Sequence, residues 1–266
     1  MGRLAHLRDT LPTYLDQAAL CAVVDYSCPE NSGHWVEENQ PECRVIRVDG
    51  RSVFNPSEAR NAGARRVDTD WFCFVDADVR LAPDFSAEVR SHLQPGTYIA
   101  FTSGESAQNG IAGTCVVPNT TFQQIGGYDE VYQGWGEEDR DLFHALELAG
   151  LERVVLPASL LSHIDHDDQA RTQHFEESDR SQSWIVNRLY RQIKFDVMKL
   201  SGQSLPVDIR HQLRTLVRDA LRNIPPGEKA VSLQIPIDNF ELGLGPQQWN
   251  LSRIMRYDIV ATLSNS

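Results

Sequence analysis

The sequence lacks a long apolar run. Its longest apolar stretch covers about residues 18–24, well short of the roughly 20 residues that a membrane-spanning helix needs. Residues 1–9 carry charges where a secretory signal peptide would have its apolar segment. We therefore predict no transmembrane helix, no secretion signal and a cytoplasmic location.

Cysteine is scarce and not arranged in pairs. The five cysteines are odd in number and contain no Cys-x-x-Cys motif. Cys21, Cys73 and Cys115 each lie within an apolar run, where a thiol behaves as a small buried hydrophobic group. This number and spacing of cysteines favours a protein of the reducing cytoplasm over a secreted protein that is stabilised by disulfides.

Basic residues are also in deficit. The chain of 266 residues has 25 Lys and Arg against 37 Asp and Glu, so its formal net charge is −12. An acidic protein repels phosphate backbones unless its basic residues are segregated, which disfavours nucleic acid as a partner. Surplus carboxylates instead suit a protein that holds an anionic substrate through a divalent cation. With 41% hydrophobic and 23% charged residues, the composition is that of a folded globular protein.

The first part of the chain alternates apolar runs with helical patterns. Leucines at positions 4, 7, 11 and 15 predict an amphipathic helix over residues 4–17. We predict buried strands in four apolar runs and two further helices between them: strands at 19–25, 43–48, 71–75 and 98–101, and helices at 56–66 and 84–93. This alternation indicates an α/β fold with parallel strands, in which ligands bind beyond the carboxyl ends of the strands.

The pattern changes after about residue 170. We predict two helices, at residues 173–200 and 207–223, followed by an irregular tail with short strands at residues 225–266. In the second helix, arginines recur every four residues at Arg210, Arg214, Arg218 and Arg222. Such a row predicts a solvated face, and contact with anionic lipid or an acidic partner is the alternative.

Two acids follow the predicted strand at 71–75. Asp76 and Asp78 flank one residue in the sequence Asp-Ala-Asp. Carboxylates at the end of a buried strand can converge on one hard cation, because the turn that follows the strand is exposed. A solvated loop is the alternative interpretation of an Asp-x-Asp motif.

A second acidic cluster surrounds a tryptophan. Trp135 lies between Gly134 and Gly136, and Glu137, Glu138, Asp139 and Asp141 follow at the start of a predicted helix. The glycines permit backbone turns that a β-carbon would hinder, and the indole can pack against the face of a sugar ring. The positive end of the helix dipole stabilises the ionised acids. Helix capping explains one such acid but not the whole group.

Two further groups have the right chemistry for a site. His163 and His166 lie among Asp165, Asp167 and Asp168, and imidazoles beside carboxylates can complete the coordination of manganese or a similar ion. Arg60 offers a fork of donors suited to a diphosphate, and its neighbour Asn61 can bridge backbone groups. A polar turn for the histidines, and structural hydrogen bonding for Arg60 and Asn61, are the alternatives.

Taken together, these motifs resemble a GT-A glycosyltransferase of the glycosyltransferase family 2 and β-1,4-galactosyltransferase-like type. The resemblance rests on the segments 60–63, 76–78, 126–129 and 134–139, with the two histidines downstream. It implies an α/β, Rossmann-like nucleotide-diphospho-sugar transferase core over residues 1–175, followed by a mostly helical extension over 176–266. In this family the chain normally begins with an apolar strand and a loop that contact the uracil, whereas here the first predicted helix follows Met1 almost at once.

The resemblance also implies roles for individual residues. Asp78 would bind Mn²⁺ (or Mg²⁺), Asp76 the ribose or the same ion, and one of His163 and His166 would be a further metal ligand. The carboxylate of Asp139 would be the catalytic base.

Other implied roles concern the substrates. Glu138 would hold the acceptor hydroxyl, and Trp135 and Gly136 would line the donor and acceptor pocket. Arg60 and Asn61 would bind substrate. Glu137 stands where the animal galactosyltransferases have glycine, so the resemblance does not predict galactose as the sugar.

The function implied is metal-dependent, inverting transfer of a sugar from a nucleotide-diphosphate sugar, with a UDP-sugar as the expected donor, to a hydroxyl of a glycan or glycoconjugate. One alternative is a catalytically inactive module that binds a sugar nucleotide or glycan. Another is a metal-dependent hydrolase or nucleotidyltransferase, which the tryptophan beside the acids disfavours. Nucleic acid is not an expected partner, and peripheral membrane contact remains an alternative.

Overall fold

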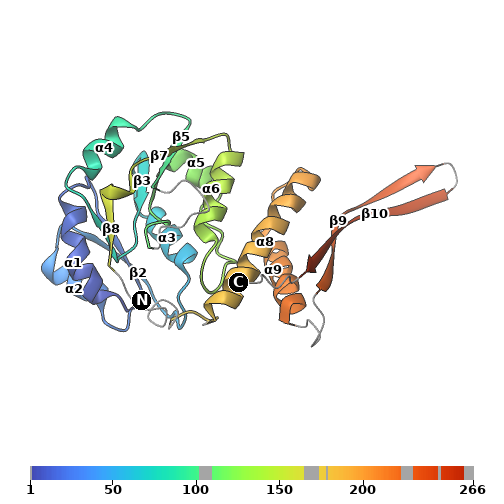
Figure 1. Ribbon diagram of the computed structural model, residues 1–266, viewed down its shortest axis with the longest axis horizontal. Coiled ribbons are helices and arrows are strands. Elements are labelled where there is room, and N and C mark those ends of the chain that lie inside the picture. Colours follow the sequence, from blue (N-terminus) through green and yellow to red (C-terminus); the bar gives the residue numbers. More distant parts are fainter. Residues whose placement is uncertain are drawn as a thin grey trace, which may run out of the picture. The chain divides into compact units, whose positions relative to one another are not determined.

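The computed structural model describes residues 2–101, 110–164, 174–177, 179–222, 230–244 and 247–260. The chain divides into two compact units, Met1–Arg180 and Ser181–Ser266, and the ribbon in Figure 1 is coloured along the sequence. Each unit is described separately below.

The first unit alternates strands and helices, as the sequence predicts. Its helices are α1 (Leu4–Leu15), α2 (Ser32–Asn39), α3 (Pro56–Ala64), α4 (Phe85–Ser91), α5 (Asn119–Gln124), α6 (Glu138–Leu148) and the 3₁₀ turn η1 (Ala158–Leu160). Its strands are β1 (Ala22–Tyr26), β2 (Arg44–Val48), β3 (Trp71–Phe74), β4 (Val79–Leu81), β5 (Thr97–Ala100), β6 (Cys115–Pro118), β7 (Glu152–Val155) and β8 (Leu161–His163). The α/β class is therefore confirmed.

The strands of the first unit form three small sheets. β1 pairs with β2 in parallel, β4 pairs with β8 in antiparallel, and the third sheet has the order β3-β6-β5-β7. In that sheet β5 and β7 are parallel, but β6 runs antiparallel to both of its neighbours. The expectation of purely parallel strands is wrong at β6 and at the β4–β8 pair, because the sequence gives no separate signal for the direction of these short strands.

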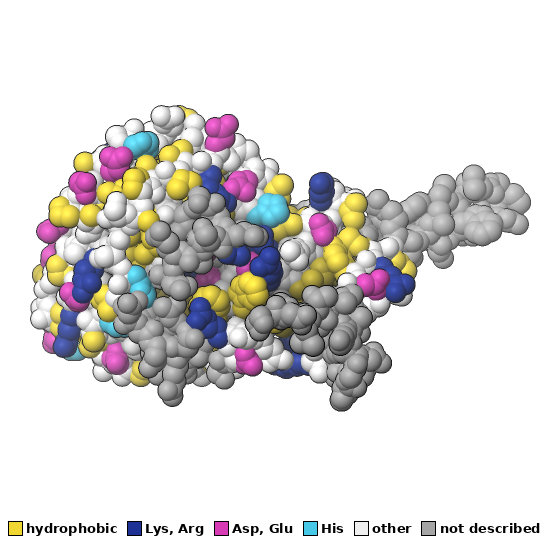
Figure 2. All heavy atoms as spheres, viewed as in Figure 1, with side chains coloured by type: hydrophobic (Ala, Val, Ile, Leu, Met, Phe, Trp, Pro, Cys, Tyr) yellow, Lys and Arg dark blue, Asp and Glu magenta, His cyan; other side chains and the backbone are white. Residues whose placement is uncertain are grey.

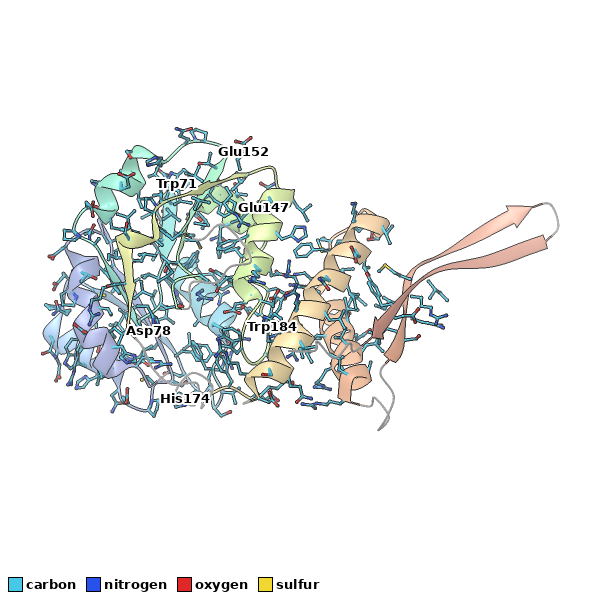
Figure 3. The ribbon with its side chains drawn as sticks, in the orientation of Figure 1. Trp71, Asp78, Glu147, Glu152, His174 and Trp184 are labelled. Carbon is cyan, nitrogen blue, oxygen red and sulfur yellow. The ribbon has the colours of Figure 1, made fainter. Side chains whose placement is uncertain are left out.

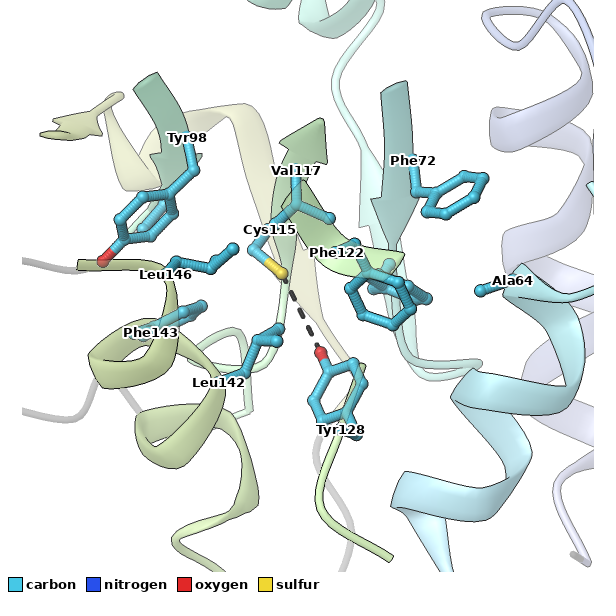
Figure 4. Close-up of a cluster of buried hydrophobic side chains, with 12 residues drawn as sticks. Ala64, Phe72, Tyr98, Cys115, Val117, Phe122, Tyr128, Leu142, Phe143 and Leu146 are labelled. Atoms are coloured by element: carbon cyan, nitrogen blue, oxygen red, sulfur yellow. Dashed lines mark hydrogen bonds between the residues drawn. The ribbon is translucent and has the colours of Figure 1, made fainter. Parts of the chain in front are cut away.

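One hydrophobic core packs α3, α5 and α6 against the β3-β6-β5-β7 sheet (Figure 4). The buried members of this cluster are Ala64, Phe72, Phe74, Tyr98, Ala100, Cys115, Val117, Phe122, Tyr128, Leu142, Phe143 and Leu146. The Cys115 thiol lies 3.9 Å from the Tyr128 hydroxyl. Cys115 thus behaves as the small buried group that its apolar run predicts.

A cavity of about 720 Å³ runs along β1 and β3 and reaches the Asp76–Asp78 segment beyond the carboxyl end of β3. Consecutive residues 19–26 and 71–78 contribute to its walls. Among the described strands, β1 pairs with β2 alone and β3 with β6 alone. Cys73 lines this cavity and is exposed to it, whereas burial raises the pKa of its thiol, so the thiol is surrounded by protein but open to the cavity. The apolar run around Cys73 forms a strand with one side toward this cavity.

The second unit contains α8 (Arg180–Ser201), apart from its first residue, which belongs to the first unit. It also contains α9 (Val207–Arg222), β9 (Ala230–Leu244) and β10 (Gln247–Val260). The two predicted helices are present, but the tail is not irregular, because β9 and β10 pair as one long antiparallel ribbon. Gly243 lies within β9, and the register of the ribbon shifts between Arg253 and Ile254.

The arginine row of α9 is only partly a solvated face. Arg214 is buried, and its Nε donates to Oδ1 of Asn187 at 3.1 Å. Leu216, expected on the opposite apolar face, is 41% exposed. The prediction of a solvated arginine face is therefore wrong at Arg214, because the Asn187 amide of α8 gives its guanidinium a buried acceptor.

No helix in the described part of the chain is both long and apolar enough to cross a membrane. On the face of the first unit seen in Figure 2, acidic side chains alternate with Lys and Arg rather than gathering in one patch.

Candidate active site

The Asp76–Asp78 motif forms a tight turn beyond the carboxyl end of β3. The turn is closed by the Val79 amide, which donates to the Asp76 carbonyl at 3.1 Å. Figure 3 shows Trp71, at the start of β3, on the upper side of the sheet and Asp78 on the lower side. The acids thus lie where a strand-end ligand site is expected in an α/β fold.

Asp78 lies beside His163. β4 and β8 pair Val79 with His163, and the Ile164 amide donates to the Asp78 carbonyl at 2.8 Å. The His163 Nε2 is 3.7 Å from the Asp78 Oδ2, and the two side chains are 8% and 15% exposed. A β-carbon at Gly110 would approach the His163 ring to 2.2 Å, so glycine at this position leaves room for the imidazole.

A carboxylate and an imidazole in contact are a suitable pair of donors for Mn²⁺. Within the described ranges, no group of three or more His, Cys, Asp and Glu side chains is placed to hold a metal ion, so the contacting pair Asp78 and His163 would be the described protein ligands. His166 lies outside the described residues. Asp76 is less suited to a cation, because its Oδ1 accepts a hydrogen bond from Arg60 at 2.8 Å.

The Arg60 guanidinium joins the strand-end acids to the acids of α6. Its Nη2 lies 2.8 Å from Asp76 Oδ1, and its Nη1 lies 3.4 Å from Glu138 Oε1 and 3.0 Å from Asp139 Oδ1. The guanidinium carbon is also 5.0 Å from the centre of the Tyr128 ring. Burial lowers the pKa of Arg60, but Asp139 and Asp76 more than compensate and hold it well above its usual value. Arg60 therefore faces carboxylates, not open solvent where a diphosphate would bind.

Glu138 and Asp139 occupy the first turn of α6 with side chains 11% and 20% exposed. Burial raises the pKa of both carboxyls, and the charge of Asp139 adds to this for Glu138, whose pKa rises to about 7. Arg60 opposes the shift at each. Below about pH 7 the Glu138 carboxyl therefore holds its proton. Of the two carboxyls, Asp139 is the nearer to the Arg60 guanidinium, at 3.0 Å, which makes it the candidate base of the pair.

The raised pKa of Glu138 makes a testable contribution to stability. A folded-state pKa of about 7 against the usual 4.5 adds stability at low pH, which is lost as the pH rises between these values. We expect chemical denaturation to show that Glu138→Gln flattens the fall in unfolding free energy over this window by up to about 3 kcal/mol. An unchanged pH slope in Glu138→Gln would contradict the assignment.

The backbone before α6 adopts left-handed conformations. Gly134 and Gly136 have φ of 72° and 91°, and Glu137 has φ of 77° although it carries a side chain. The Glu137 side chain is 1% exposed and forms an ion pair with Arg140 at 3.2 Å. Buried contacts of this kind can hold a non-glycine residue in a conformation that otherwise costs of order 1 kcal/mol.

Trp135 and Gly136 line the cavity together with Glu138 and Asp139. The Arg180 guanidinium carbon, which belongs to the same compact unit, lies 4.0 Å from the centre of the Trp135 ring. An arginine therefore stacks on this indole, whereas the sequence suggested a sugar platform.

Asn61 has a structural role in this arrangement. Its Oδ1 accepts from the Tyr128 amide at 2.9 Å, and its Nδ2 donates to the Tyr128 carbonyl at 2.9 Å and to Glu130 Oε1 at 2.8 Å. A β-carbon at Gly127 would approach Asn61 Oδ1 to 2.5 Å. Of the two interpretations of Asn61, the structure matches backbone bridging: the amide fixes the Gly126–Asp129 segment.

Gly113 provides a close approach that the sequence did not indicate. A β-carbon there would lie 2.8 Å from Asp139 Oδ2 and 3.0 Å from Arg60 Nη2. A signal that could have found Gly110 and Gly113 is the pair of glycines in the segment that follows the predicted strand at 98–101. Their role depends on contacts with residues about 30 to 50 positions away in the sequence.

We expect Gly113→Ala to displace Asp139 or Arg60 and to lower kcat/KM by about 100-fold, because misplacing a reacting group by about 1 Å has this effect. Gly63→Ala is the matched control, since its β-carbon would meet only the Val24 side chain, at 3.1 Å. Steady-state kinetics of both variants, with melting temperatures, make the comparison. Equal losses of activity in the two variants would contradict the packing argument.

Comparison with known proteins places these features in a family context. Residues 3–112 match the family described as glycosyl transferase family 2, and residues 101–169 match the one described as the N-terminal domain of galactosyltransferase. Human β-1,4-galactosyltransferase 2 is 25% identical over 179 residues, covering 62% of this chain and 48% of that protein. Human β-1,4-galactosyltransferase 1 is 25% identical over 194 residues, covering 64% and 46%. The chain spans about half the length of these curated relatives.

A solved structure of similar fold is the mannosyltransferase PcManGT from Pyrobaculum calidifontis in complex with GDP-Man and Mn²⁺. Its TM-score is 0.53 at 11% identity, and the match covers 83% of this chain and 72% of that chain. These comparisons confirm the GT-A fold and the resemblance to family 2 glycosyltransferases and galactosyltransferases that the motifs indicate.

Proposed function

We propose that this chain, whose residues 3–169 resemble glycosyltransferase family 2 and galactosyltransferase domains, is a metal-dependent inverting glycosyltransferase. It would move a sugar from a nucleotide-diphosphate sugar, with a UDP-sugar as the expected donor, to a hydroxyl of a glycan or glycoconjugate. The observation that carries this proposal is the Arg60 contact with Asp76 on one side and with Glu138 and Asp139 on the other. Arg60 thereby joins a cation-binding edge to an acid and base pair in one cavity.

Asp78 and His163 would hold Mn²⁺, or Mg²⁺ as the alternative, at the cation-binding edge of the cavity. The mannosyltransferase of similar fold was solved with Mn²⁺ and a nucleotide sugar, which supports a cation of this kind. When bound, the cation offsets the negative charge of the departing diphosphate. Diphosphate oxygens and water can complete the coordination of such an ion, which retains several non-protein ligands in many enzymes.

Asp139 is the proposed base. Its carboxyl lies 3.0 Å from the Arg60 guanidinium and lines the cavity, so in its ionised form it can take the proton of an acceptor hydroxyl as that oxygen attacks the anomeric carbon. Glu138, which retains its proton to a higher pH, can donate a hydrogen bond to the acceptor oxygen or to a neighbouring hydroxyl. Attack from the face opposite the diphosphate inverts the anomeric configuration.

The test is a screen of UDP- and GDP-sugars for release of the nucleotide, with Mn²⁺ and with a chelator. We expect release from one or a few donors that requires the metal and increases when a suitable acceptor glycan is present. Binding of nucleotide without turnover of any donor would instead support an inactive binding module. Turnover that is equal with and without the chelator would contradict metal dependence.

A further inference from the structure

One face of α1 and of the turn that follows it is lined by polar side chains directed at the backbone of residues 76–86. Thr10, Thr13, Tyr14 and Gln17 are spaced by three and four residues, so they lie along the same side of the helix. Thr10 and Tyr14 are buried. The leucine periodicity predicted the helix, but it gave no role to this polar row.

The first half of the row holds the acidic turn. The Tyr14 hydroxyl is 2.9 Å from the Asp76 carbonyl and also contacts the carbonyl of Val79. The Thr10 hydroxyl donates to the Ala77 carbonyl at 2.9 Å. Two side chains of α1 thus reach three of the four carbonyls in the Asp76–Val79 turn.

The fourth carbonyl of the turn is held from another side, because Asp78 accepts from the Ile164 amide at 2.8 Å. All four carbonyls therefore have donors, which fixes the direction in which the Asp76 and Asp78 side chains leave the backbone. In the described part of the chain, β3 pairs with β6 and with no strand on its other side. Helix α1 therefore supplies hydrogen bonds to a turn whose strand, β3, has no second strand partner among the described residues.

The second half of the row contacts backbone farther from the acids. The Thr13 hydroxyl accepts from the Leu81 amide at 3.2 Å. Gln17 donates from Nε2 to the Ala82 carbonyl at 2.6 Å and accepts at Oε1 from the Ser86 amide at 2.8 Å. These contacts attach α1 to β4 and to the start of α4. Because Gln17 contacts backbone outside the Asp76–Val79 turn, it serves as an internal control for the hydroxyls that contact the turn.

We propose that Thr10 and Tyr14 are positioning residues for the donor: they orient the Asp76–Asp78 turn so that Asp78 receives a divalent cation and, through it, a nucleoside diphosphate, while Asp76 keeps its contact with Arg60. The inference rests on the proposed function and adds to it two residues that lie outside the catalytic motifs. A hydroxyl that only stabilised the packing of α1 would affect the melting temperature without a selective effect on this ligand.

The test compares variants that each remove one hydrogen-bonding group. Tyr14→Phe and Thr10→Val remove the hydroxyls at the turn, Gln17→Leu removes the amide at Ala82 and Ser86, and Thr10→Ser retains the hydroxyl. Tyr98→Phe is a matched control, because the Tyr98 hydroxyl donates to Glu147 Oε1 at 2.9 Å away from the acidic turn. Calorimetric titration with UDP in the presence of Mn²⁺ measures the dissociation constant of each variant.

We expect Tyr14→Phe and Thr10→Val each to weaken UDP binding in the presence of Mn²⁺ by about three- to tenfold, the effect of one hydrogen bond. Their kcat at saturating donor and metal should stay within about twofold of the wild type, since they act through the turn. Gln17→Leu and Tyr98→Phe should leave the dissociation constant unchanged, and Thr10→Ser should restore it. Equal weakening by Gln17→Leu, or no weakening by Tyr14→Phe, would overturn the proposal.

Hydrogen exchange separates this proposal from the proposed function. If the wild-type protein binds no UDP with Mn²⁺, the proposed function fails, and exchange of residues 76–81 then tests the positioning role. We expect faster exchange of this segment in Tyr14→Phe than in Gln17→Leu or Tyr98→Phe. The same exchange in all three variants would overturn the inference independently of activity.

Discussion

Asp139→Asn should lower kcat by about 100- to 10,000-fold, the range that a positioned general base contributes. The amide has nearly the shape of the carboxylate but cannot accept the acceptor proton. Donor binding should change by no more than about threefold, because the proposed cation ligands Asp78 and His163 are separate from Asp139. The measurement is steady-state transfer together with a UDP titration in Mn²⁺.

A matched control for this variant is present in the same helix. Asp141 is buried and accepts a hydrogen bond from the Tyr132 hydroxyl at 2.9 Å. Asp141→Asn should reduce stability while retaining most of kcat. If Asp139→Asn lost donor binding and turnover in equal proportion, the base assignment would be wrong.

Arg60→Met should produce the largest change in stability. The Arg60 side chain is 12% exposed and lies within 4 Å of three carboxylates, and removing one partner of a buried ionic group typically costs about 3–5 kcal/mol. Without the guanidinium, burial and mutual repulsion would raise the pKa values of Glu138 and Asp139 further. The unfolding free energy of the variant should therefore fall as the pH rises and recover as the carboxyls take up protons.

Chemical denaturation between about pH 5 and 8 measures this effect. Arg60→Lys retains the charge but not the planar fork that contacts several carboxylates at once, so it should restore only part of the stability. A loss below about 1 kcal/mol in Arg60→Met that did not depend on pH would contradict the central place given to Arg60.

Much of the fold could be predicted from periodicity and composition. The leucine spacing of α1, the apolar runs of β1, β2 and β3, and the acids at the start of α6 all appear where expected. The direction of β6 and the long β9–β10 ribbon were not predicted, because strand direction and partner depend on contacts between distant segments. Pattern reasoning also assigned Arg214 to the surface, since it could not foresee the Asn187 amide beside it.

The candidate site shows the same limit. The sequence identified Asp76, Asp78, Glu138 and Asp139 by type and spacing, and the Asp-x-Asp turn lies at the end of β3 as predicted. It did not indicate that the Arg60 guanidinium contacts these acids, nor that the absence of a side chain at Gly113 leaves room for the contact between Arg60 and Asp139. These features depend on three-dimensional distances between residues that are far apart in the chain, which a single sequence does not give.

The measurement that tests the account most directly is a crossed comparison of Asp78→Asn and Asp139→Asn in the presence and absence of Mn²⁺. The account predicts that Asp78→Asn loses the metal-dependent part of UDP binding, whereas Asp139→Asn binds UDP with Mn²⁺ almost as the wild type does but transfers sugar at least about 100-fold more slowly. Two variants that lose binding and transfer to the same extent would contradict the division of the site into a cation-binding edge and a base.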